Sequence, residues 1–349
     1  MSNYDQFAAA VKEISGGKNV VLLDDLGLPS VYVPINKLKN SEIISGGSEN
    51  THPAFSVNGV EKSRFLYSKY QNIVINGRAY SLSHRDPKTY VNFDQARQAC
   101  EAKGAGFHLG TLAEWAAVAL LTRKMGTMPH GNNNYGGDSA YTYEKGQESA
   151  KDNNKTGRTF TGSGPATWGH DHTQFGIQDM NGNVWEWLGG MRLNEGEIQI
   201  IPYNNAALGS ECDMSASSTL WKAIKNDGSL VAPGTAATLK YDFVSGNIQF
   251  TTGITSAQDA GRGGSYTAMT LASGVTAPEL AKALILYPDE PGKDYGGDYH
   301  WMNNVGERLP IAGGSWGSGA IAGVIYLNLG NARSYSDGNV GFRSAYVEL

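Results

Sequence analysis

The sequence contains few cysteines and few charged residues. Only two cysteines, Cys100 and Cys212, occur among 349 residues, and nothing in the sequence places them near each other. Two distant cysteines make neither a disulfide framework nor a zinc site. Charged residues account for 17% of the chain, with 28 Lys and Arg against 33 Asp and Glu, which gives a net charge of −5. Because the sequence also lacks a basic block, we expect no nucleic-acid partner.

Long apolar segments are also missing. No uninterrupted apolar stretch is long enough to span a bilayer, so no membrane insertion is expected. A secretory signal begins with a basic region followed by an apolar run, and the first residues, MSNYDQFAAAVKEISGG, contain neither. We therefore expect synthesis in the cytoplasm. If the protein acts outside a cell, it would leave by a route other than Sec secretion, either in a virion, for example on a phage tail, or by export to the cell surface.

Glycine, by contrast, is abundant, with 45 copies. Such a chain buries a core but spends much of its length in turns and irregular loops. Residues 1–48 predict a small N-terminal module: apolar residues recur at helical spacing from Phe7 to Ile14, and two apolar runs, 20–23 and 31–35, predict a hairpin. The sequence leaves open whether this module serves attachment or oligomerisation, or caps the main domain.

The following segment predicts a hairpin and then two helices. The run FLYSKYQNIVINGRAYSL predicts two strands joined by a turn at Asn76-Gly77. Two helices are then expected, with Phe93 in the apolar face of the first and Trp115 in the apolar face of the second. Thr111 lies three residues before Glu114, a spacing that fits a capping box at the start of the second helix.

The motif GIQDMNGNVWEW places two tryptophans two residues apart. On a strand, Trp185 and Trp187 would point to the same side, toward a core, and Glu186 to the opposite side. Near the C-terminus, Arg343 lies in the short segment GFR among residues of a buried type. A buried arginine needs an acceptor, and Glu186 or Asp179 is expected to provide it.

The C-terminal stretch, residues 313–346, mixes a stiff framework with a second population of residues. This second population, which we call the variable set, contains only residues that can be reached from the Asn codon AAC by changes in its first or second base. Lys, Glu, Gln, Met and Trp, which cannot be reached if the final C is fixed, do not occur in it. The variable set consists of Gly317, Ser318, Ile321, Tyr326, Asn328, Gly330, Asn331, Tyr335, Asp337, Gly338 and Asn339.

Several motifs, in order, resemble a known fold family. FDQARQAC, HLGTLAEW, GIQDMNGNVWEW, GGSW and GFR are similar to the motifs of the formylglycine-generating-enzyme type of C-type lectin fold. The resemblance implies an α+β, glycine- and loop-rich domain over residues 49–349, with residues 1–48 as a small extension. It would contain a long insert at 191–309, which is expected to pack beside the C-terminal stretch because structureless loops of such length are rare.

The C-terminal stretch itself resembles the variable region of the target-binding proteins that diversity-generating retroelements diversify. This resemblance implies that the variable set forms a ligand-binding surface. Its expected ligand is a cell-surface protein or glycan, as in phage tail-associated host recognition. Tyr326 and Tyr335 would be aromatic anchors, Asp337 a charged specificity element and Ile321 an apolar contact. The framework residues Trp316, Leu327, Leu329 and Phe342 should be buried. The alternative is an ordinary hairpin, because most residues of the variable set are common in turns.

An enzymatic function is the alternative from a different class. Formylglycine-generating enzymes use a pair of cysteines near the C-terminus to bind copper, whereas this chain has no cysteine after Cys212, so we expect no catalysis of that type. The related iron-dependent sulfoxide synthases need a histidine cluster. His170 and His172 form the only close histidine pair, and Asp171 would point to the other side of a strand.

A structural cation is the one cofactor that the sequence suggests. Oxygen-bearing side chains cluster around Gly182, and calcium takes oxygen ligands from loops of this kind. An Asx turn leading into a strand explains the same residues. Homo-oligomerisation is a further expectation, since several copies acting together raise a weak affinity. The four candidate ligands are Asp179, Asn181, Asn183 and Glu186.

Overall fold

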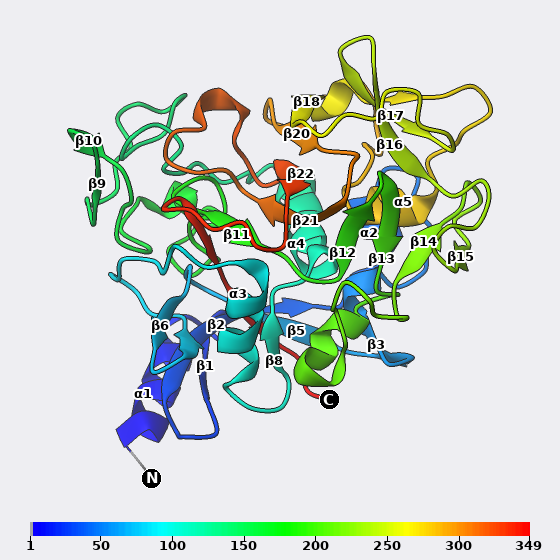
Figure 1. Ribbon diagram of the computed structural model, residues 1–349. Coiled ribbons are helices and arrows are strands. Elements are labelled where there is room, and N and C mark those ends of the chain that lie inside the picture. The colour runs from blue at the N-terminus through cyan, green and yellow to red at the C-terminus, as the bar shows by residue number, and fades with distance from the viewer. Residues whose placement is uncertain (1–2) are drawn as a thin grey trace.

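A five-stranded sheet joins the beginning and the end of the chain. The computed structural model describes residues 3–349 (Figure 1), and in it the order of this sheet is β1-β2-β5-β24-β8. All of its neighbouring strands are antiparallel. The C-terminal strand therefore lies between two strands from the first third of the sequence. The five strands are β1 (Val20–Leu23), β2 (Pro29–Asn36), β5 (Arg64–Ser68), β8 (Phe107–Leu109) and β24 (Ser344–Tyr346).

A second, larger sheet carries the C-terminal stretch and the long insert. Its main path is β18-β20-β22-β21-β12-β13-β16-β17-β19, while β11 joins β21 to β23 and β13 pairs with the short hairpin of β14 and β15. Its strands are β11 (Trp185–Trp187), β12 (Met191–Asn194), β13 (Glu197–Ile200), β14 (Lys222–Ile224), β15 (Leu230–Val231), β16 (Lys240–Val244), β17 (Asn247–Thr251), β18 (Arg262–Ser265), β19 (Thr270–Leu271), β20 (Tyr299–Met302), β21 (Glu307–Ala312), β22 (Leu327–Asn331) and β23 (Val340–Phe342).

Both predicted central helices are present, and both begin with a capping box. Helix α3 (Phe93–Glu101) is capped by Asn92, and helix α4 (Leu112–Met125) is capped by Thr111 with Glu114 as its reciprocal partner. Helix α4 is buried on nearly all sides over residues 112–120 rather than on one face, because both sheets and the insert pack around it. Its C-terminus ends at Gly126, which has a φ of 70°, the left-handed conformation that suits glycine.

The smaller elements complete the fold. The predicted turn at Asn76-Gly77 joins two strands that pair from Ile73↔Tyr80 to Ile75↔Arg78. Within residues 3–349, no helix is long and apolar enough to cross a membrane. The remaining helices and strands are α1 (Asn3–Ile14), α2 (Asn40–Ile43), α5 (Glu279–Ala283), β3 (Ser56–Val57), β4 (Val60–Glu61), β6 (Ile73–Ile75), β7 (Arg78–Tyr80), β9 (Lys151–Asp152) and β10 (Lys155–Thr156).

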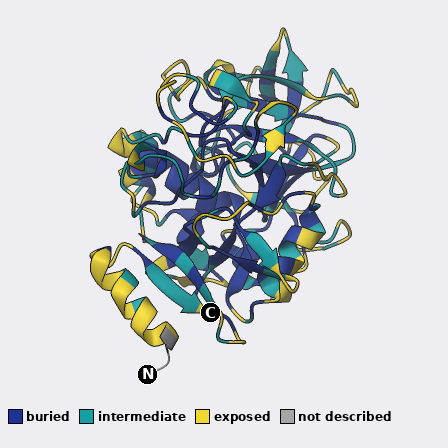
Figure 2. Ribbon diagram, turned by 90° about the vertical axis from the view of Figure 1, so that its left-hand side faces the viewer, coloured by how far each residue is buried: buried dark blue, intermediate teal, exposed yellow. Residues whose placement is uncertain are grey.

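The N-terminal hairpin is part of the five-stranded sheet. As predicted, residues 20–36 form two antiparallel strands, but the second strand also pairs with β5 over five residues, from Tyr32↔Ser68 to Asn36↔Arg64. Helix α1, in contrast, lies on the outside and is largely exposed (Figure 2). The hairpin thus packs with the rest of the molecule, and a domain division after residue 48 stays a prediction.

The insert packs beside the C-terminal stretch. Strands β16 and β17 form a hairpin with a two-residue turn, Ser245-Gly246, because Asn247 already pairs with Val244. The insert also contains the short helix α5. Strand β20 of the insert pairs in parallel with β22, which carries part of the variable set. The insert therefore supports the C-terminal stretch from one side.

Candidate functional site

A buried ion pair fixes the base of the C-terminal stretch. The Arg343 guanidinium donates two hydrogen bonds of 2.5 Å to the Glu186 carboxylate, and both side chains are almost completely buried. Arg343 also donates to the carbonyl oxygens of Ser68 and Gln178, each at 3.1 Å. The prediction of Glu186 as the acceptor is confirmed, while Asp179 contributes only its backbone carbonyl, at 3.4 Å. All three residues of β11 are buried, because the strand lies between β21 and β23.

The first loop of the C-terminal stretch, residues 313–326, is held by contacts with its backbone. The Trp115 indole donates to the Val324 carbonyl at 2.7 Å, and the Asp298 carboxylate accepts from the Ile325 amide at 2.7 Å. At its start, Gly313 has a φ of 88°, and an added Cβ would lie 2.7 Å from the Met180 carbonyl oxygen. Only glycine fits this close approach.

The second loop, residues 332–339, is held in a similar way. The Arg333 guanidinium makes ion pairs with Glu307 and Asp94, at 3.0 and 2.9 Å. The backbone amide of Tyr90 donates to the Asp337 carbonyl at 3.0 Å, and that of Trp185 donates to the Asn339 carbonyl at 2.9 Å. None of these contacts uses a side chain of the variable set, so they remain when those side chains change. One backbone contact does depend on the set, since the Asp337 carboxylate accepts from the Gly338 amide at 2.5 Å.

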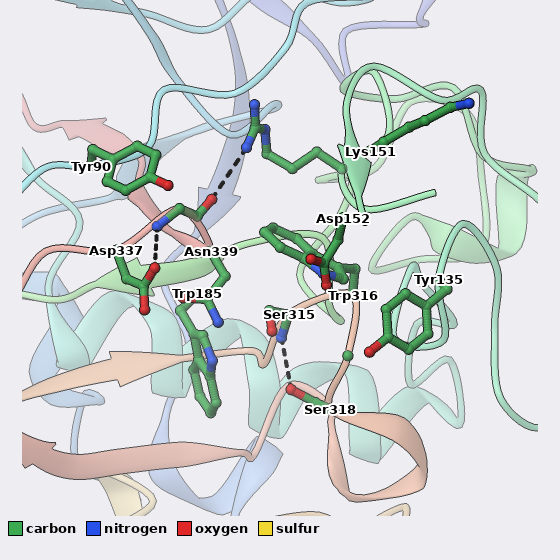
Figure 3. A pocket seen from close by; sticks show the side chains of 13 residues that line it. Tyr90, Tyr135, Lys151, Asp152, Trp185, Ser315, Trp316, Ser318, Asp337 and Asn339 are labelled. Atoms are coloured by element: carbon green, nitrogen blue, oxygen red, sulfur yellow. Dashed lines mark hydrogen bonds between the residues drawn. The ribbon is translucent and has the colours of Figure 1, made fainter. Parts of the chain in front are cut away.

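Between the two loops lies a hollow of about 560 Å³ (Figure 3). Five members of the variable set line it, and the remaining lining residues come from the framework and from loops far away in the sequence. Figure 3 shows Asp337 and Asn339 on one side and Tyr135 with Ser318 on the other, with Trp185 and Trp316 between them. The lining residues are Tyr90, Tyr135, Lys151, Asp152, Arg158, Trp185, Ser315, Trp316, Gly317, Ser318, Asp337, Gly338 and Asn339.

Two aromatic residues of the stretch are placed opposite to expectation. Tyr326, expected as an exposed anchor, is 4% exposed: its ring packs on Trp185 with centroids 4.6 Å apart, and its hydroxyl accepts from the Trp301 indole at 2.9 Å. Burial raises its pKa to about 12. Trp316, expected in the core, is only half-buried and lines the hollow, where its indole donates to Asp152 at 3.2 Å. The expected burial of Leu327, Leu329 and Phe342 is confirmed.

Other members of the variable set lie outside the lining of the hollow. Tyr335 is exposed and its hydroxyl donates to the Asp337 carboxylate at 3.2 Å. Ile321 is half-buried against the apolar core. Asn328, Gly330 and Asn331 are half-buried on β22, where the Asn328 side chain accepts from the Gly330 amide at 2.9 Å. The structure thus gathers one part of the set around the hollow and places the rest outside its lining.

Several residues around the hollow were not expected from the sequence. Tyr90 and Tyr135 both have a positive φ, 55° and 48°, and so lie at sharp bends of loops. Asp152 belongs to the small hairpin of β9 and β10, and Arg158 follows that hairpin. The region between the second helix and the motif GIQDMNGNVWEW carries no helical or strand periodicity, so no sequence signal indicated that it would approach the C-terminus.

The four residues expected to hold a cation are engaged by protein donors. The Asn183 side-chain oxygen accepts from the Thr159 backbone amide at 2.8 Å, and the Asn181 side-chain oxygen accepts from the Asn133 side-chain amide at 3.3 Å. Glu186 is neutralised by Arg343. One Asp179 oxygen accepts from the Gly162 amide at 2.8 Å, and burial raises the pKa of this carboxyl to about 6. The other Asp179 oxygen is buried without a hydrogen-bond partner among the described residues. At the remaining oxygens a cation would have to displace the donors, and the calcium site stays an untested prediction.

The comparison with family models decides the family of this chain. The model of the sulfatase-modifying factor enzyme 1-like domain matches residues 34–270. The chain belongs to this family. The α+β fold of the formylglycine-generating-enzyme type, expected from the sequence, is thereby confirmed. The family match ends before the C-terminal stretch, so it describes the scaffold and leaves residues 313–346 outside. Among curated proteins, none matches the chain.

Solved structures similar to this member of the sulfatase-modifying factor family share little sequence with it. A structure of PvdO from Pseudomonas aeruginosa is 13% identical with a TM-score of 0.38, and the match covers 94% of this chain and 97% of PvdO. Treponema denticola variable protein 1 is 13% identical with a TM-score of 0.34, covering 94% of this chain and 98% of that chain. The Major Tropism Determinant U1 variant is 11% identical with a TM-score of 0.32, and the match covers 90% of this chain and 62% of that chain.

Enzymes occur in the sulfatase-modifying factor family, so the surroundings of the cysteines and of the close histidine pair bear on catalysis. Cys100 and Cys212 are both buried in the apolar core, and burial raises the pKa of both thiols, that of Cys212 to about 11. His170 accepts from the Ile177 amide at 2.9 Å, and burial lowers its pKa to about 4. His172 contacts the Met128 carbonyl at 3.1 Å. Among the described residues, no three His, Cys, Asp or Glu side chains are arranged to hold a metal ion.

Proposed function

We propose that this protein binds a ligand through a C-terminal surface that can be diversified. The observation that supports the proposal is that framework residues and members of the variable set have different roles in residues 313–346. Framework residues hold the backbone of both loops, as Trp115 does at Val324 and Arg333 does at Glu307. Members of the variable set place their side chains along the hollow between the loops.

The composition of this surface suits the proposal. Tyrosine brings a large contact area with few rotatable bonds, while Ser, Gly and Asn bring adaptable hydrogen bonding. Substitutions away from the core and from buried polar contacts usually change stability little. The exposed and half-buried members of the variable set can therefore change their recognition chemistry while the fold is kept, which is the property that a diversified binding protein needs. Tyr326, which packs on Trp185 in the core, is the exception.

In its finer form, the proposal is host recognition at a phage tail, with a cell-surface protein or glycan as the ligand and with no catalysis. Two features support the absence of catalysis of the formylglycine-generating type. The chain has no cysteine in its C-terminal stretch, and the two thiols that it has are buried and held protonated. Thiolates, rather than thiols, bind metal and react.

Comparative nucleotide sequencing of the locus tests the proposal. We expect sibling genomes to differ at codons such as 317, 318, 335 and 337, and we expect these differences to match adenines in a nearby near-copy of the stretch. Codons of buried framework residues such as Leu327 and Phe342 serve as the internal control and should stay constant. A uniform stretch without a near-copy would contradict diversification.

A metal-dependent oxidase is the second candidate, and family membership is the observation that favours it. Stoichiometric iron or copper in the purified protein, lost on replacing both His170 and His172 by alanine, would establish this candidate. We expect metal analysis to give no such dependence, because both imidazoles already contact backbone groups.

A further inference from the structure

We propose that the hollow between the two loops binds a neutral sugar ring; this inference names the ligand class of the proposed function and rests on it. A sugar presents apolar C–H faces on one side of its ring and many hydroxyl groups at its rim. A matching site combines aromatic faces with short polar side chains and carries little net charge. The lining of the hollow has all three properties.

Aromatic side chains form the walls of the hollow. Trp316 is half-buried at its floor, and its indole N–H is bound to Asp152 at 3.2 Å, which fixes the orientation of the ring. Tyr135 stands on the far side of Trp316 from Asp337 (Figure 3). Tyr90 is 67% exposed at the rim. Aromatic rings bring apolar faces together with a polar edge, which suits a ligand that has apolar faces and a polar rim.

Short acceptors and hydroxyls occupy the space between these rings. The Asp337 carboxylate already accepts from the Tyr335 hydroxyl at 3.2 Å, and the Asp152 carboxylate accepts from the Trp316 indole. Each carboxylate offers about four acceptor positions, so both retain capacity for ligand hydroxyls. Ser318 adds a hydroxyl that accepts from the Ser315 amide at 2.9 Å and can donate its own proton to a ligand. Asn339 adds the N–H donors of its side-chain amide, whose oxygen is buried. Vicinal hydroxyls need such mixed partners.

The charges around the hollow nearly cancel, which argues against a strongly charged ligand. The lining contains two cationic residues, Lys151 and Arg158, and two anionic residues, Asp152 and Asp337. Arg158 is neutralised by Asp86 through two contacts of 2.8 Å. The remaining excess of one carboxylate is offset by a cation outside the lining, since the Lys155 ammonium lies 4.4 Å from the centre of the Tyr135 ring.

The site has a constant half and a changeable half. Trp316, Tyr135 and Asp152 are outside the variable set and would hold the ring of any sugar. Ser318 and Asp337 belong to the variable set and would read the configuration of its hydroxyl groups. Position 317 adjusts the width: a Cβ added at Gly317 would lie 3.5 Å from the Tyr135 hydroxyl, an ordinary contact that narrows the hollow without a clash.

Titration of the full-length protein with a panel of neutral methyl glycosides, followed by saturation-transfer NMR and tryptophan fluorescence, tests this inference. We expect at least one glycoside to bind at millimolar concentration. Loss of a charge-assisted hydrogen bond or of aromatic contact should weaken binding by about tenfold in Asp152→Ala and in Trp316→Ala. Tyr143→Ala is the matched control, because Tyr143 is 79% exposed and lies outside the lining of the hollow.

Further variants keep the inference testable if Trp316→Ala does not fold. Trp316→Tyr retains a ring and should weaken binding less than Asp152→Ala does. Ser318→Asn should change which glycoside of the panel binds best.

The inference is overturned if no glycoside binds, or if Asp152→Ala binds as the Tyr143→Ala control does. Absence of glycoside binding together with diversified codons would indicate another ligand, such as a protein, and would leave the proposed function intact. Glycoside binding at a uniform locus would refute only the diversification.

Discussion

Among single residues, Glu186 and Arg343 form a buried ion pair between β11 and the segment that joins β23 to β24. Its charges are nearly inaccessible to solvent, so each can be buried only because the other is present. Glu186→Gln leaves the arginine charge uncompensated and should lower the free energy of unfolding by about 3–5 kcal/mol. Urea unfolding measures the change. Glu211→Gln, at an exposed position, should stay within about 0.5 kcal/mol; equal effects of both variants would contradict the assignment.

Asp298 gives a second prediction at this scale, one that depends on pH. Burial raises the pKa of its carboxyl from 3.8 to about 8. Between these values the folded protein keeps a proton that the unfolded chain has released, so this group makes stability fall as the pH rises from about 4 to about 8 and has a constant effect outside that window. Asp298→Asn stays neutral and can still accept from the Ile325 amide.

The stability difference between Asp298→Asn and the wild type should therefore grow in favour of the variant across that window. Urea unfolding at a series of pH values measures it. Asp227, an exposed aspartate whose pKa is lowered by Ser229, is the control. Asp227→Asn should differ from the wild type above the ordinary carboxyl pKa, with the wild type more stable, and should converge with it in acid. If the stabilities of Asp298→Asn and the wild type changed with pH in parallel, the raised pKa of Asp298 would be refuted.

At the scale of elements, helix α4 matters to the site because it holds the first loop. The Trp115 indole is the donor to the Val324 carbonyl, so Trp115→Phe leaves that buried carbonyl without its partner and should cost about 1–3 kcal/mol. Hydrogen exchange should accelerate for amides of residues 319–326. Trp221→Phe is the matched control, since its indole donates to the Ser215 carbonyl at 2.9 Å, away from the loop. It should destabilise similarly without changing exchange in residues 319–326.

Local elements were predictable from the sequence, and contacts between distant elements were not. The Thr111 and Glu114 capping box and the Asn76-Gly77 turn involve neighbours in the chain, and both are present. Arg343 and Glu186 are far apart, yet their pairing was predictable because a buried arginine needs a carboxylate. The codon pattern, however, indicates which residues can change and not which way they point. Tyr326 is buried because Trp185 and Trp301, from two other strands, close over it.

At the scale of the whole molecule, the framework of the C-terminal stretch should be far less tolerant than the variable set. The triple variant Ser318→Asn, Tyr335→Asn and Asp337→Asn should change the free energy of unfolding by no more than about 1.5 kcal/mol, because each position is at least partly exposed and single changes at such positions usually stay within about 0.5 kcal/mol. Since the Tyr335 hydroxyl donates to the Asp337 carboxylate, replacing both residues removes one shared contact rather than two. Leu327→Ala alone, at a fully buried position, should cost about 2–5 kcal/mol. Thermal and urea unfolding measure the stability of both variants. A triple variant as unstable as Leu327→Ala would contradict the difference in tolerance between the framework and the variable set.

The central place of β24 in the five-stranded sheet has a consequence for biosynthesis. Strands β5 and β8 have no common neighbour until residues 344–346 have left the ribosome. The scaffold is thus completed only after the codons of the variable set have been translated. Pairing of strands that are far apart in the sequence is slow. Until β24 pairs with them, the facing edges of β5 and β8 have unpaired backbone groups. If the variable set is diversified as proposed, each new copy must therefore first finish folding before proteases or aggregation remove it, and only then can it be selected by ligand binding.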